Sequence, residues 1–235
     1  MFIRRMLKVA IFVVLLTLAG VSSYCLWVVS TAREYTLSTV LPEVRERSYA
    51  LSPWVLTPRQ TDILLKVEDP NFFGHGGVDF LTPGAGITTI TQSLVKGLYF
   101  DAFKPGVAKL KQTVIAAFVL DPLMSKEEQL RLFLNTIYLG NQAWGFAQAS
   151  EVYFGKPFSE LEEEEYMALV AMIIAPTVFD LRAHPDRNAE RVARIKRLVA
   201  GEYVPRGVCD LYYGKIAPEA QEDLPPFSYF SGYYE

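Results

Sequence analysis

The feature that most constrains this chain is an uncharged apolar segment close to its N-terminus. The stretch from Val9 to Val29 contains no Asp, Glu, Lys or Arg. An α-helix of about 20 apolar residues is long enough to cross the hydrocarbon core of a bilayer. Three basic residues lie within 4–8, whereas residues 33–34 carry one positive and one negative charge. The positive-inside rule therefore predicts a single-pass membrane protein with a cytoplasmic N-terminus and an extracytoplasmic domain.

A cleaved signal peptide is the alternative to an uncleaved anchor. The apolar core of a signal peptide is typically about 7–15 residues long and is followed by a cleavage site of small residues. The stretch from Val9 to Val29 is longer, and no Ala-x-Ala pattern follows it. Cys25 also lacks the preceding small residues of a lipoprotein signal. These patterns favour an uncleaved anchor.

Composition narrows the classes of function. The chain has 235 residues, of which 51% are hydrophobic and 21% charged, so it can bury the core of one domain behind the anchor. Its formal net charge of −3 argues against nucleic acid as a partner. Cys25 lies in the apolar segment and Cys209 near the C-terminus, so no internal disulfide is expected. His75 and His184 are too far apart to suggest a metal site.

Helix signals dominate the rest of the chain, and strand signals are nearly absent, so we predict an all-α domain. We divide the chain into a cytoplasmic tail (1–8), a transmembrane anchor (9–29), a membrane-proximal linker (30–50), a helical domain (51–200) and a C-terminal tail (201–235).

Three capping boxes predict where helices of the domain begin. Thr57 opens a helix that ends near Asp69, because Pro70 disfavours helix in the residue before it. Ser125 opens a second helix, which we expect to end at Gly140. Ser159 opens a third, over Met167 to Ile174 and ended by Pro176.

Further helices follow from the apolar pattern. The run from Val114 to Leu120 is continuously apolar, which predicts a central helix buried on all sides. Another helix starts at Thr88, and a basic helix spans Arg187 to Arg197. The acidic run from Glu162 to Glu165 is typical of a solvated first turn, and we assign it no function.

Adjacent carboxylates, Glu68 and Asp69, are the first candidates for chemistry. At a helix C-terminus the helix dipole and their mutual repulsion both favour a proton, so at least one pKa is expected to be raised. A carboxylate tuned in this way can act as a general base or acid. The structural alternative is that Asp69 or Asp79 caps the glycine-rich loop that follows and that Glu68 forms a surface ion pair.

Two further groups of polar residues suit a sugar and a phosphate. The helix that starts at Thr88 carries hydroxyl, amide and ammonium groups on one face, from Thr88, Thr89, Gln92, Ser93 and Lys96. Lys109 and Lys111 open the next helix, whose N-terminus also favours an anion. Taken alone, each group could equally be a solvated helix face.

The order and spacing of these residues resemble the family 51 glycosyltransferases that polymerise peptidoglycan. The resemblance covers about residues 51–198 and is carried by five ordered motifs: Glu68-Asp69-x-x-Phe72-x-x-His75-x-Gly77-x-Asp79, Thr88-Thr89-Ile90-Thr91-Gln92-x-Leu94-x-Lys96, Leu134-Asn135-x-x-Tyr138-x-Gly140, Tyr153-Phe154-Gly155-Lys156, and Ala175-Pro176 before the basic helix.

This resemblance implies a lysozyme-like helical domain in a bacterial inner membrane protein, with the domain on the periplasmic side. The domain would join lipid-linked disaccharides (lipid II) into glycan strands and release undecaprenyl pyrophosphate. Glu68 matches the base that deprotonates the acceptor sugar. The substrate-binding residues implied by the match are Asp69, Thr88, Thr89, Gln92, Lys96, Lys109, Lys111, Gln112, Asn135 and Tyr138. Expected partners are lipid II, the growing strand and other wall-synthesis proteins.

The chain departs from the family pattern in its third motif. The family has Arg-Lys-x-x-Glu there, whereas residues 109–113 read Lys-Leu-Lys-Gln-Thr. Either Gln112 or Thr113 takes the place of the second glutamate, and neither is acidic. Some family members use a divalent cation, Mg²⁺ or Mn²⁺, near this glutamate; we expect that no cofactor is required here and no metal site. The segment between Asp79 and Thr88 is also shorter than usual in the family, where a mobile stretch closes over the donor.

Three hypotheses of function remain open at this stage. The first is a working polymerase with Glu68 as base. The second is a catalytically inactive binding or scaffold protein of the wall-synthesis machinery, because the second glutamate is missing. The third is a lytic hydrolase that uses Glu68 as general acid.

The aromatic residues after the helix that starts at Thr88 have two possible environments. Tyr99, Phe100 and Phe103 either touch the membrane interface or pack in the core.

Overall fold

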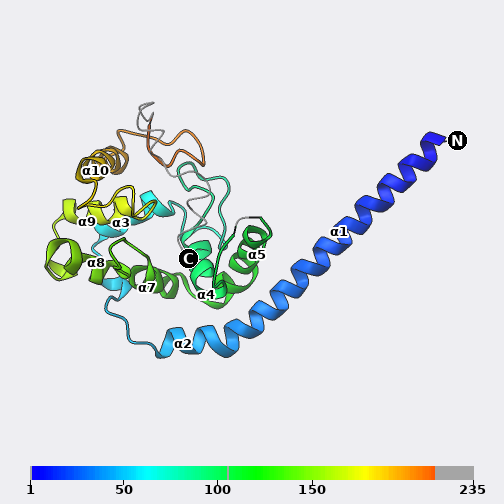
Figure 1. The fold of residues 1–235 in the computed structure, drawn as a ribbon, viewed down its shortest axis with the longest axis horizontal. Helices are drawn as coiled ribbons and strands as arrows, with labels where there is room; N and C mark the ends of the chain where they lie inside the picture. Colours follow the sequence, from blue (N-terminus) through cyan, green and yellow to red (C-terminus); the bar gives the residue numbers. More distant parts are fainter. Residues whose placement is uncertain (1, 105, 215–235) are drawn as a thin grey trace.

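The computed structural model describes residues 2–104 and 106–214. The described residues are helical and form no β-strand, and one isolated bridge joins Tyr138 to Trp144. The prediction of an all-α fold is therefore confirmed. A long N-terminal helix projects from a rounded group of shorter helices (Figure 1).

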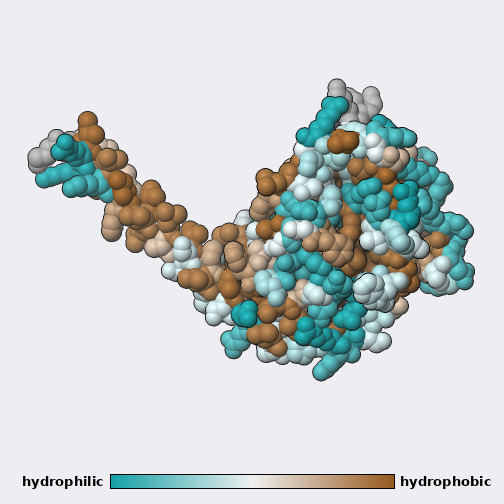
Figure 2. Space-filling view, turned by 180° about the vertical axis from the view of Figure 1, so that it is seen from behind, coloured by the Kyte–Doolittle hydropathy of each residue, from teal (hydrophilic) through white to brown (hydrophobic). Residues whose placement is uncertain are grey.

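The projecting helix is α1, Phe2–Tyr35. It continues through a π-helical turn, η1 (Thr36–Val40), into α2 (Leu41–Glu46). Over Ile3–Glu46 it is long and apolar enough to cross a membrane, by length and composition. The apolar side chains of its protruding part are exposed, and Figure 2 shows them as a brown surface that ends in a hydrophilic tip.

The segment predicted as a membrane-proximal linker is largely helical and part of it belongs to the core. Ala32, Val40 and Val44 are buried against the domain. The hydroxyl of buried Thr36 lies 2.6 Å from the hydroxyl of Tyr99. The same helix that carries the apolar stretch is thus packed directly on the domain, mainly against α5.

The aromatic side chains of Tyr99, Phe100 and Phe103 contact other aromatic rings of the protein. Tyr99 meets the ring of Tyr35 edge-on, with centroids 5.6 Å apart. Phe103 is buried, and its ring lies edge-on to Phe100 at 5.3 Å. Phe103 therefore packs in the core, whereas Tyr99 and Phe100 are half-buried where the domain meets the projecting helix.

The described part of the domain contains seven main helices, and the longest connection between them is the loop of residues 69–89 between α3 and α4. They are α3 (Pro58–Glu68), α4 (Ile90–Tyr99), α5 (Val107–Ile115), α7 (Lys126–Thr136), α8 (Gly145–Phe154), α9 (Glu163–Met172) and α10 (Pro185–Val199). The short elements are η2 (Pro53–Val55), η3 (Ala116–Leu120), α6 (Asp121–Leu123) and η4 (Phe158–Glu160). Every residue of α9 from Tyr166 to Met172 is buried, and α9 packs against α10, α3 and α8.

The prediction that Val114 to Leu120 is buried on all sides is wrong at Phe118. This side chain is 63% exposed, although Ile115, Val119 and Leu120 are fully buried. The backbone changes from α5 to the π-helical turn η3 at Ala116, which alters the helical phase. The helix buried on all sides is α9 instead.

Two predicted helix boundaries also differ from the structure. The helix opened by Ser125 ends at Thr136 rather than at Gly140, which lies in a following turn. The capping box before α9 is formed by Glu162 and Glu165, whereas Ser159 lies in η4. The capping boxes predicted at Thr57 and Ser125 are both confirmed. The basic helix is also confirmed, as α10.

Candidate active site

Glu68 is the last residue of α3, and its position follows from local sequence. Thr57 and Gln60 form the capping box that starts the helix, and Ile63, Leu64 and Val67 bury one face of it. The helix ends there because Pro70 excludes helical geometry at the residue before it. Glu68 is thereby held beside the core at a helix C-terminus.

The Glu68 carboxylate is set up to accept a proton near neutral pH. Burial raises its pKa from 4.5 to about 7; the negative charge of Asp69 adds to the rise, and the positive charge of Arg191 opposes it. Within the described parts of the chain, no hydrogen bond or ion pair engages this carboxylate. A half-buried carboxylate with this pKa and no partner is available as a general base.

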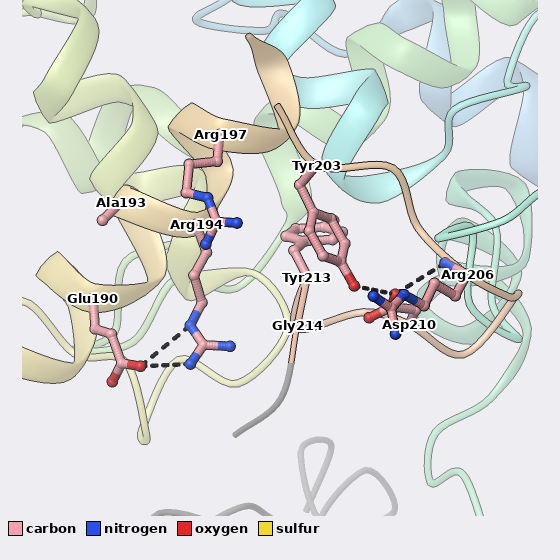
Figure 3. Close-up of a pocket in the computed structure, with 9 residues that line it drawn as sticks. All are labelled: Glu190, Ala193, Arg194, Arg197, Tyr203, Arg206, Asp210, Tyr213 and Gly214. Atoms are coloured by element: carbon pink, nitrogen blue, oxygen red, sulfur yellow. Dashed lines mark hydrogen bonds and ion pairs between the residues drawn. The ribbon is translucent and has the colours of Figure 1, made fainter. Parts of the chain in front are cut away.

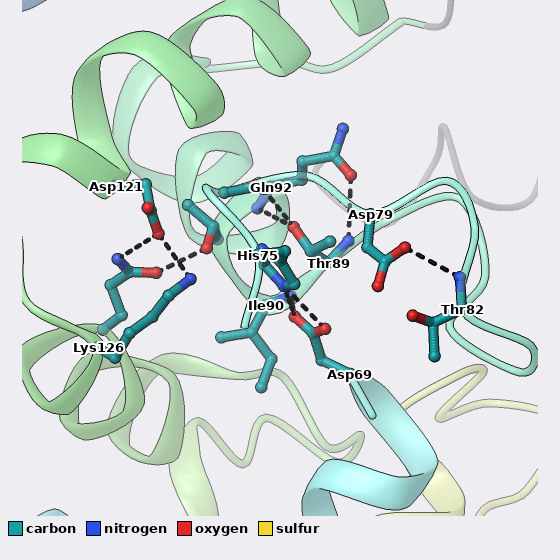
Figure 4. Close-up of polar contacts among 12 residues, drawn as sticks. Asp69, His75, Asp79, Thr82, Thr89, Ile90, Gln92, Asp121 and Lys126 are labelled. Carbon is teal, nitrogen blue, oxygen red and sulfur yellow. Dashed lines mark hydrogen bonds and ion pairs between the residues drawn. The ribbon is translucent and has the colours of Figure 1, made fainter. Parts of the chain in front are cut away.

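Asp69 differs from Glu68 because it is fully buried and its carboxylate is hydrogen-bonded. Its carboxylate lies 2.9 and 3.0 Å from Nε2 of His75, and it accepts a hydrogen bond from the backbone N–H of Ile90 at 2.9 Å. The Thr89 hydroxyl donates to the carbonyl of Gly77 at 2.7 Å. These contacts tie the glycine-rich loop to the N-terminus of α4 (Figure 4).

Asp79 caps the same loop, as the structural alternative anticipated. One carboxylate oxygen accepts hydrogen bonds from the backbone N–H groups of Leu81 and Thr82, at 2.9 and 3.0 Å. Burial works to raise the pKa of Asp79, but hydrogen bonds from Thr82, Leu81 and Asn71 outweigh it and lower the pKa to about 2. Asp79 therefore remains ionised and holds the loop.

The start of α4 uses two of the predicted ligand residues for its own structure. Thr89 and Gln92 form a reciprocal capping box, and both are buried. The amide nitrogen of Gln92 also donates to the hydroxyl of Thr113 at 3.0 Å. Thr88 is exposed at the edge of this group. Substrate binding by these residues stays a prediction, and for Gln92 it would require part of the capping box to open.

Lysines form a positively charged group beside Thr88. The ammonium of Lys109 donates to the Thr88 hydroxyl at 3.0 Å and to the carbonyl of Ile87 at 2.8 Å. Burial and, to a lesser extent, the charge of Lys96 together lower the pKa of Lys109 to about 8. Burial also lowers the pKa of Lys96. Two cations that repel each other in this way would both be stabilised by an anion between them.

Two aromatic rings support the positions of these lysines. Lys96 lies over the ring of Phe103 at 5.1 Å, and Lys111 lies over the ring of Phe100 at 5.2 Å. The structure thus brings Thr88, Lys96 and Lys109 together, and Lys111 stands on the same short helix as Lys109.

The position of the missing second glutamate is occupied by hydrogen-bonded neutral groups. Gln112 is fully buried, and its amide nitrogen donates to the carbonyl of Gln92 at 2.6 Å. Thr113 donates to the carbonyl of Lys109 at 2.8 Å while it accepts from Gln92. No group of three Asp, Glu, His or Cys side chains in residues 2–104 and 106–214 could hold a metal ion. These residues do not fit a divalent cation.

Asn135 and Tyr138 take part in other contacts. The amide of Asn135 pairs with both backbone groups of Leu51, at 2.9 and 2.8 Å, and also donates to the carbonyl of Arg131. It therefore fastens the segment before α3 to α7. The ring of Tyr138 packs on Trp144 with centroids 4.9 Å apart. Their predicted roles in substrate binding stay predictions.

Arg191 of α10 is the functional candidate that the sequence interpretation missed. It is 3% exposed, and it donates to the carbonyls of Ala171 and Leu211, at 3.0 and 3.1 Å. Its charge acts on Glu68. The spacing could have revealed it, because Arg191 shares one face of α10 with the buried residues Asn188, Ile195 and Leu198. An arginine of a basic helix that has the same helical spacing as the apolar residues is expected to be buried.

Comparison with known proteins identifies the family of this chain. The family model described as Transglycosylase matches residues 36–200. The chain therefore belongs to the transglycosylase family. The match begins at Thr36, inside the projecting helix, and ends at the last turn after α10.

Individual relatives differ greatly in length from this chain. It is 32% identical to Penicillin-binding protein 1F of Bacillus subtilis over 57% of this chain and 21% of that protein. It is 31% identical to Penicillin-binding protein 1A of Escherichia coli over 63% of this chain and 19% of that protein. A Cupriavidus necator protein named "Putative transglycosylase" is 30% identical, over 62% of this chain and 71% of that protein. The chain thus spans about a fifth of the two penicillin-binding proteins.

Proposed function

We propose that this protein is a peptidoglycan glycosyltransferase that polymerises lipid-linked disaccharide units into glycan strands. The observation that carries the proposal is the Glu68 carboxylate, which makes no hydrogen bond or ion pair within the described residues, together with the lysines on and beside α4. Glu68 has a pKa of about 7, and Asp69 beside it is hydrogen-bonded to Ile90, the first residue of α4. Lys96 extends from that helix, and Lys109 bonds to Thr88 just before it. One site thus offers a base and a place for an anionic leaving group.

The proposed reaction follows from these groups. Glu68 removes the proton from the 4-hydroxyl of the acceptor sugar, and that oxygen forms a bond to the anomeric carbon of the donor. The bond from the anomeric carbon to the pyrophosphate breaks, and its electron pair leaves with undecaprenyl pyrophosphate. Lys96 and Lys109, with Lys111 on the same helix, stabilise the charge that develops on the leaving group. The proton on Glu68 is then released to solvent.

The projecting helix supports the choice of a lipid-linked substrate. Apolar residues of α1 up to Val21 are exposed, and from Tyr24 onward one face of the helix packs against the core. If α1 crosses the inner membrane with its N-terminus in the cytoplasm, the domain lies directly at the outer surface of that membrane. A sugar on a long lipid tail would reach the site there without leaving the bilayer.

The test is glycan-strand formation by the full-length protein from purified lipid-linked precursor. We expect polymer from the wild type and a loss of about 1,000-fold in rate for Glu68→Gln, since general bases contribute about 10²–10⁴-fold and Gln cannot accept the proton. Glu151→Gln, an exposed glutamate on α8, is the matched control and should keep full activity. Equal polymerisation by Glu68→Gln would refute the assignment. Release of soluble fragments from isolated wall material would indicate a hydrolase instead.

A second candidate function is a catalytically inactive binding protein of wall synthesis. The hydrogen-bonded neutral residues Gln112 and Thr113 favour it, because a carboxylate of the family motif is missing there. Thr113 is half-buried beside the amide of Gln92, whereas Gln112 is fully buried, so Thr113→Glu is the replacement to test. An inactive wild type that gains polymerisation with Thr113→Glu would support this candidate. Robust wild-type activity would exclude it.

A further inference from the structure

The chain that follows the family-matched region returns to the candidate site. We define residues 203–214 as the C-terminal strap. It runs from the end of α10 towards the glycine-rich loop, and Figure 3 shows part of it beside α10. The backbone N–H groups of Gly84 and Gly86 donate to the carbonyls of Gly207 and Val208, at 2.9 and 2.8 Å. The loop between Asp79 and Thr88 is therefore fastened to the strap.

The loop and the strap fit each other closely. Gly84 and Gly86 both have positive φ, of 79° and 70°. A Cβ atom on Gly84 would lie 2.9 Å from Pro205, and one on Gly86 would lie 3.0 Å from Leu211. Glycine at these two positions thus permits both the backbone conformation and the close approach of the strap.

Tyr213 is the strap residue that reaches the helix carrying the base. It is 1% exposed, and its hydroxyl donates to the carbonyl of Val67 at 3.0 Å. Val67 immediately precedes Glu68, and its carbonyl is one of the last four of α3, which have no partner within the helix. Tyr213 thus caps the C-terminus of α3 through tertiary structure, at the carbonyl of the residue before Glu68.

The strap also holds the cation that acts on Glu68. Arg191 donates to the carbonyl of Leu211, and its guanidinium lies over the rings of Tyr212 and Tyr213, at 5.6 and 5.7 Å. The charges of Glu68 and Arg191 in turn act on Tyr213. Glu68, Arg191 and Tyr213 therefore form one group, two members of which lie outside α3.

We propose that Tyr213, a residue beyond the family-matched region, is a positioning residue for Glu68. Its hydroxyl fixes the end of α3, and its ring helps to hold Arg191 at the distance that keeps Glu68 partly ionised at neutral pH. Tyr213 then acts on the proposed base from outside the family-matched region. This inference rests on the proposed function, but its effect on the Glu68 carboxyl can be measured without turnover.

The chain offers a matched control on the same strap. Tyr203 donates its hydroxyl to Asp210 at 2.6 Å, within the strap. Both tyrosines border a pocket of about 700 Å³ between α10 and the strap, which is also lined by Arg194, Arg197 and Arg206 (Figure 3). Tyr203→Phe removes a hydrogen bond from the strap without touching α3, whereas Tyr213→Phe removes the bond to Val67.

The experiment compares both variants with wild type as full-length protein in detergent. Polymerisation is measured as kcat and KM across pH 5.5–9, thermal unfolding is measured for each protein, and the Glu68 carboxyl is titrated by ¹³C NMR with Glu68→Gln for assignment. For Tyr213→Phe we expect kcat to fall about tenfold with KM within twofold. The pKa of Glu68 should rise, because the end of α3 is no longer fixed where the positive charge of Arg191 lowers this pKa. Tyr203→Phe should leave kcat and KM within twofold of the wild type and the pKa of Glu68 unshifted.

The outcomes separate this inference from the proposed function. If Tyr213→Phe lowers Tm but leaves kcat and the Glu68 titration unchanged, its role is structural and the inference is wrong. The same holds if both variants change kcat equally. If the wild type forms no polymer, the proposed function fails, and the Glu68 titration alone then decides the inference.

Discussion

The carboxylates of Asp180 and Glu68 belong to the same helical domain, but their surroundings differ. Asp180 is buried and accepts four hydrogen bonds, from the Tyr153 hydroxyl at 2.8 Å, the Asn141 amide at 3.1 Å, and the backbone N–H groups of Arg182 and Ala183 at 2.8 Å each. Glu68 is half-buried and accepts none within the described residues. The first arrangement stabilises the fold, and the second leaves a group free for substrate at the expense of stability.

Replacement of Asp180 gives the largest effect that we expect on stability. Asp180→Ala removes an acceptor from the Tyr153 hydroxyl, the Asn141 amide and two backbone N–H groups, so we expect a loss of about 3 kcal/mol in the free energy of unfolding. The kcat of the folded fraction should stay within twofold of wild type. Denaturation and polymerisation assays on the same preparation check both statements. A large fall in kcat with unchanged stability would reverse the roles assigned to the two carboxylates.

Lys109 tests the cationic half of the site. Lys109→Met keeps the length of the side chain and removes the charge that would face the leaving group, so we expect kcat/KM to fall about 30-fold, or roughly 2 kcal/mol. Stability should not fall, because Lys109 is partly desolvated and repelled by Lys96. Lys104→Met, at an exposed lysine of the preceding loop, is the control and should retain activity. Unchanged kcat/KM in Lys109→Met would remove this lysine from the mechanism.

Glu68 should lower stability where it is ionised. Its pKa is raised in the folded chain to about 7 from 4.5, so its contribution to stability is fully present below about pH 4.5 and is lost as the pH rises through about 7. At pH 8, Glu68→Gln should therefore increase the free energy of unfolding by about 1–2 kcal/mol, and at pH 4 by nothing. Thermal unfolding at the two pH values measures this. Glu151→Gln should show no such pH dependence; a destabilised Glu68→Gln at pH 8 would contradict the prediction.

The smallest expected effect is a shift in the pH profile of kcat/KM. Activity should rise with pH as Glu68 ionises at about 7 and fall as Lys109 loses its proton at about 8. The charge of Lys96 contributes to the low pKa of Lys109, so Lys96→Met should move the upper limb upward by less than about one pH unit. Lys111→Met should leave that limb in place. An unmoved limb in Lys96→Met would show that the two lysines are not coupled.

Local signals in the sequence predicted much of the fold. The capping boxes at Thr57 and Ser125 were found because each needs only side chains and backbone groups within four residues. The same reasoning failed before α9, where Ser159 and Glu162 both satisfy the pattern and the structure uses Glu162. It also interpreted Thr89 and Gln92 as part of a ligand face and did not recognise that they form a capping box as well.

Burial was predicted less well than helix positions. The apolar run that contains Phe118 was expected to be buried all round, but a π-helical turn exposes this residue. Arg191 was predicted only as part of a basic helix, and the structure shows it buried among aromatic rings. Which side of a helix is covered depends on neighbours that periodicity does not identify.

The sequence by itself determined the apolar N-terminal helix, the helical class of the domain and the place of Glu68 at the end of α3, since each depends on residues within a few positions. Only the tertiary structure decided what Glu68 can do. Its pKa depends on desolvation by the surrounding core and on the charge of Arg191, and the hydrogen bond to the preceding carbonyl comes from Tyr213, 146 residues away. Electrostatic effects act through space, so their influence on a pKa can be assigned only when the positions of distant segments are known.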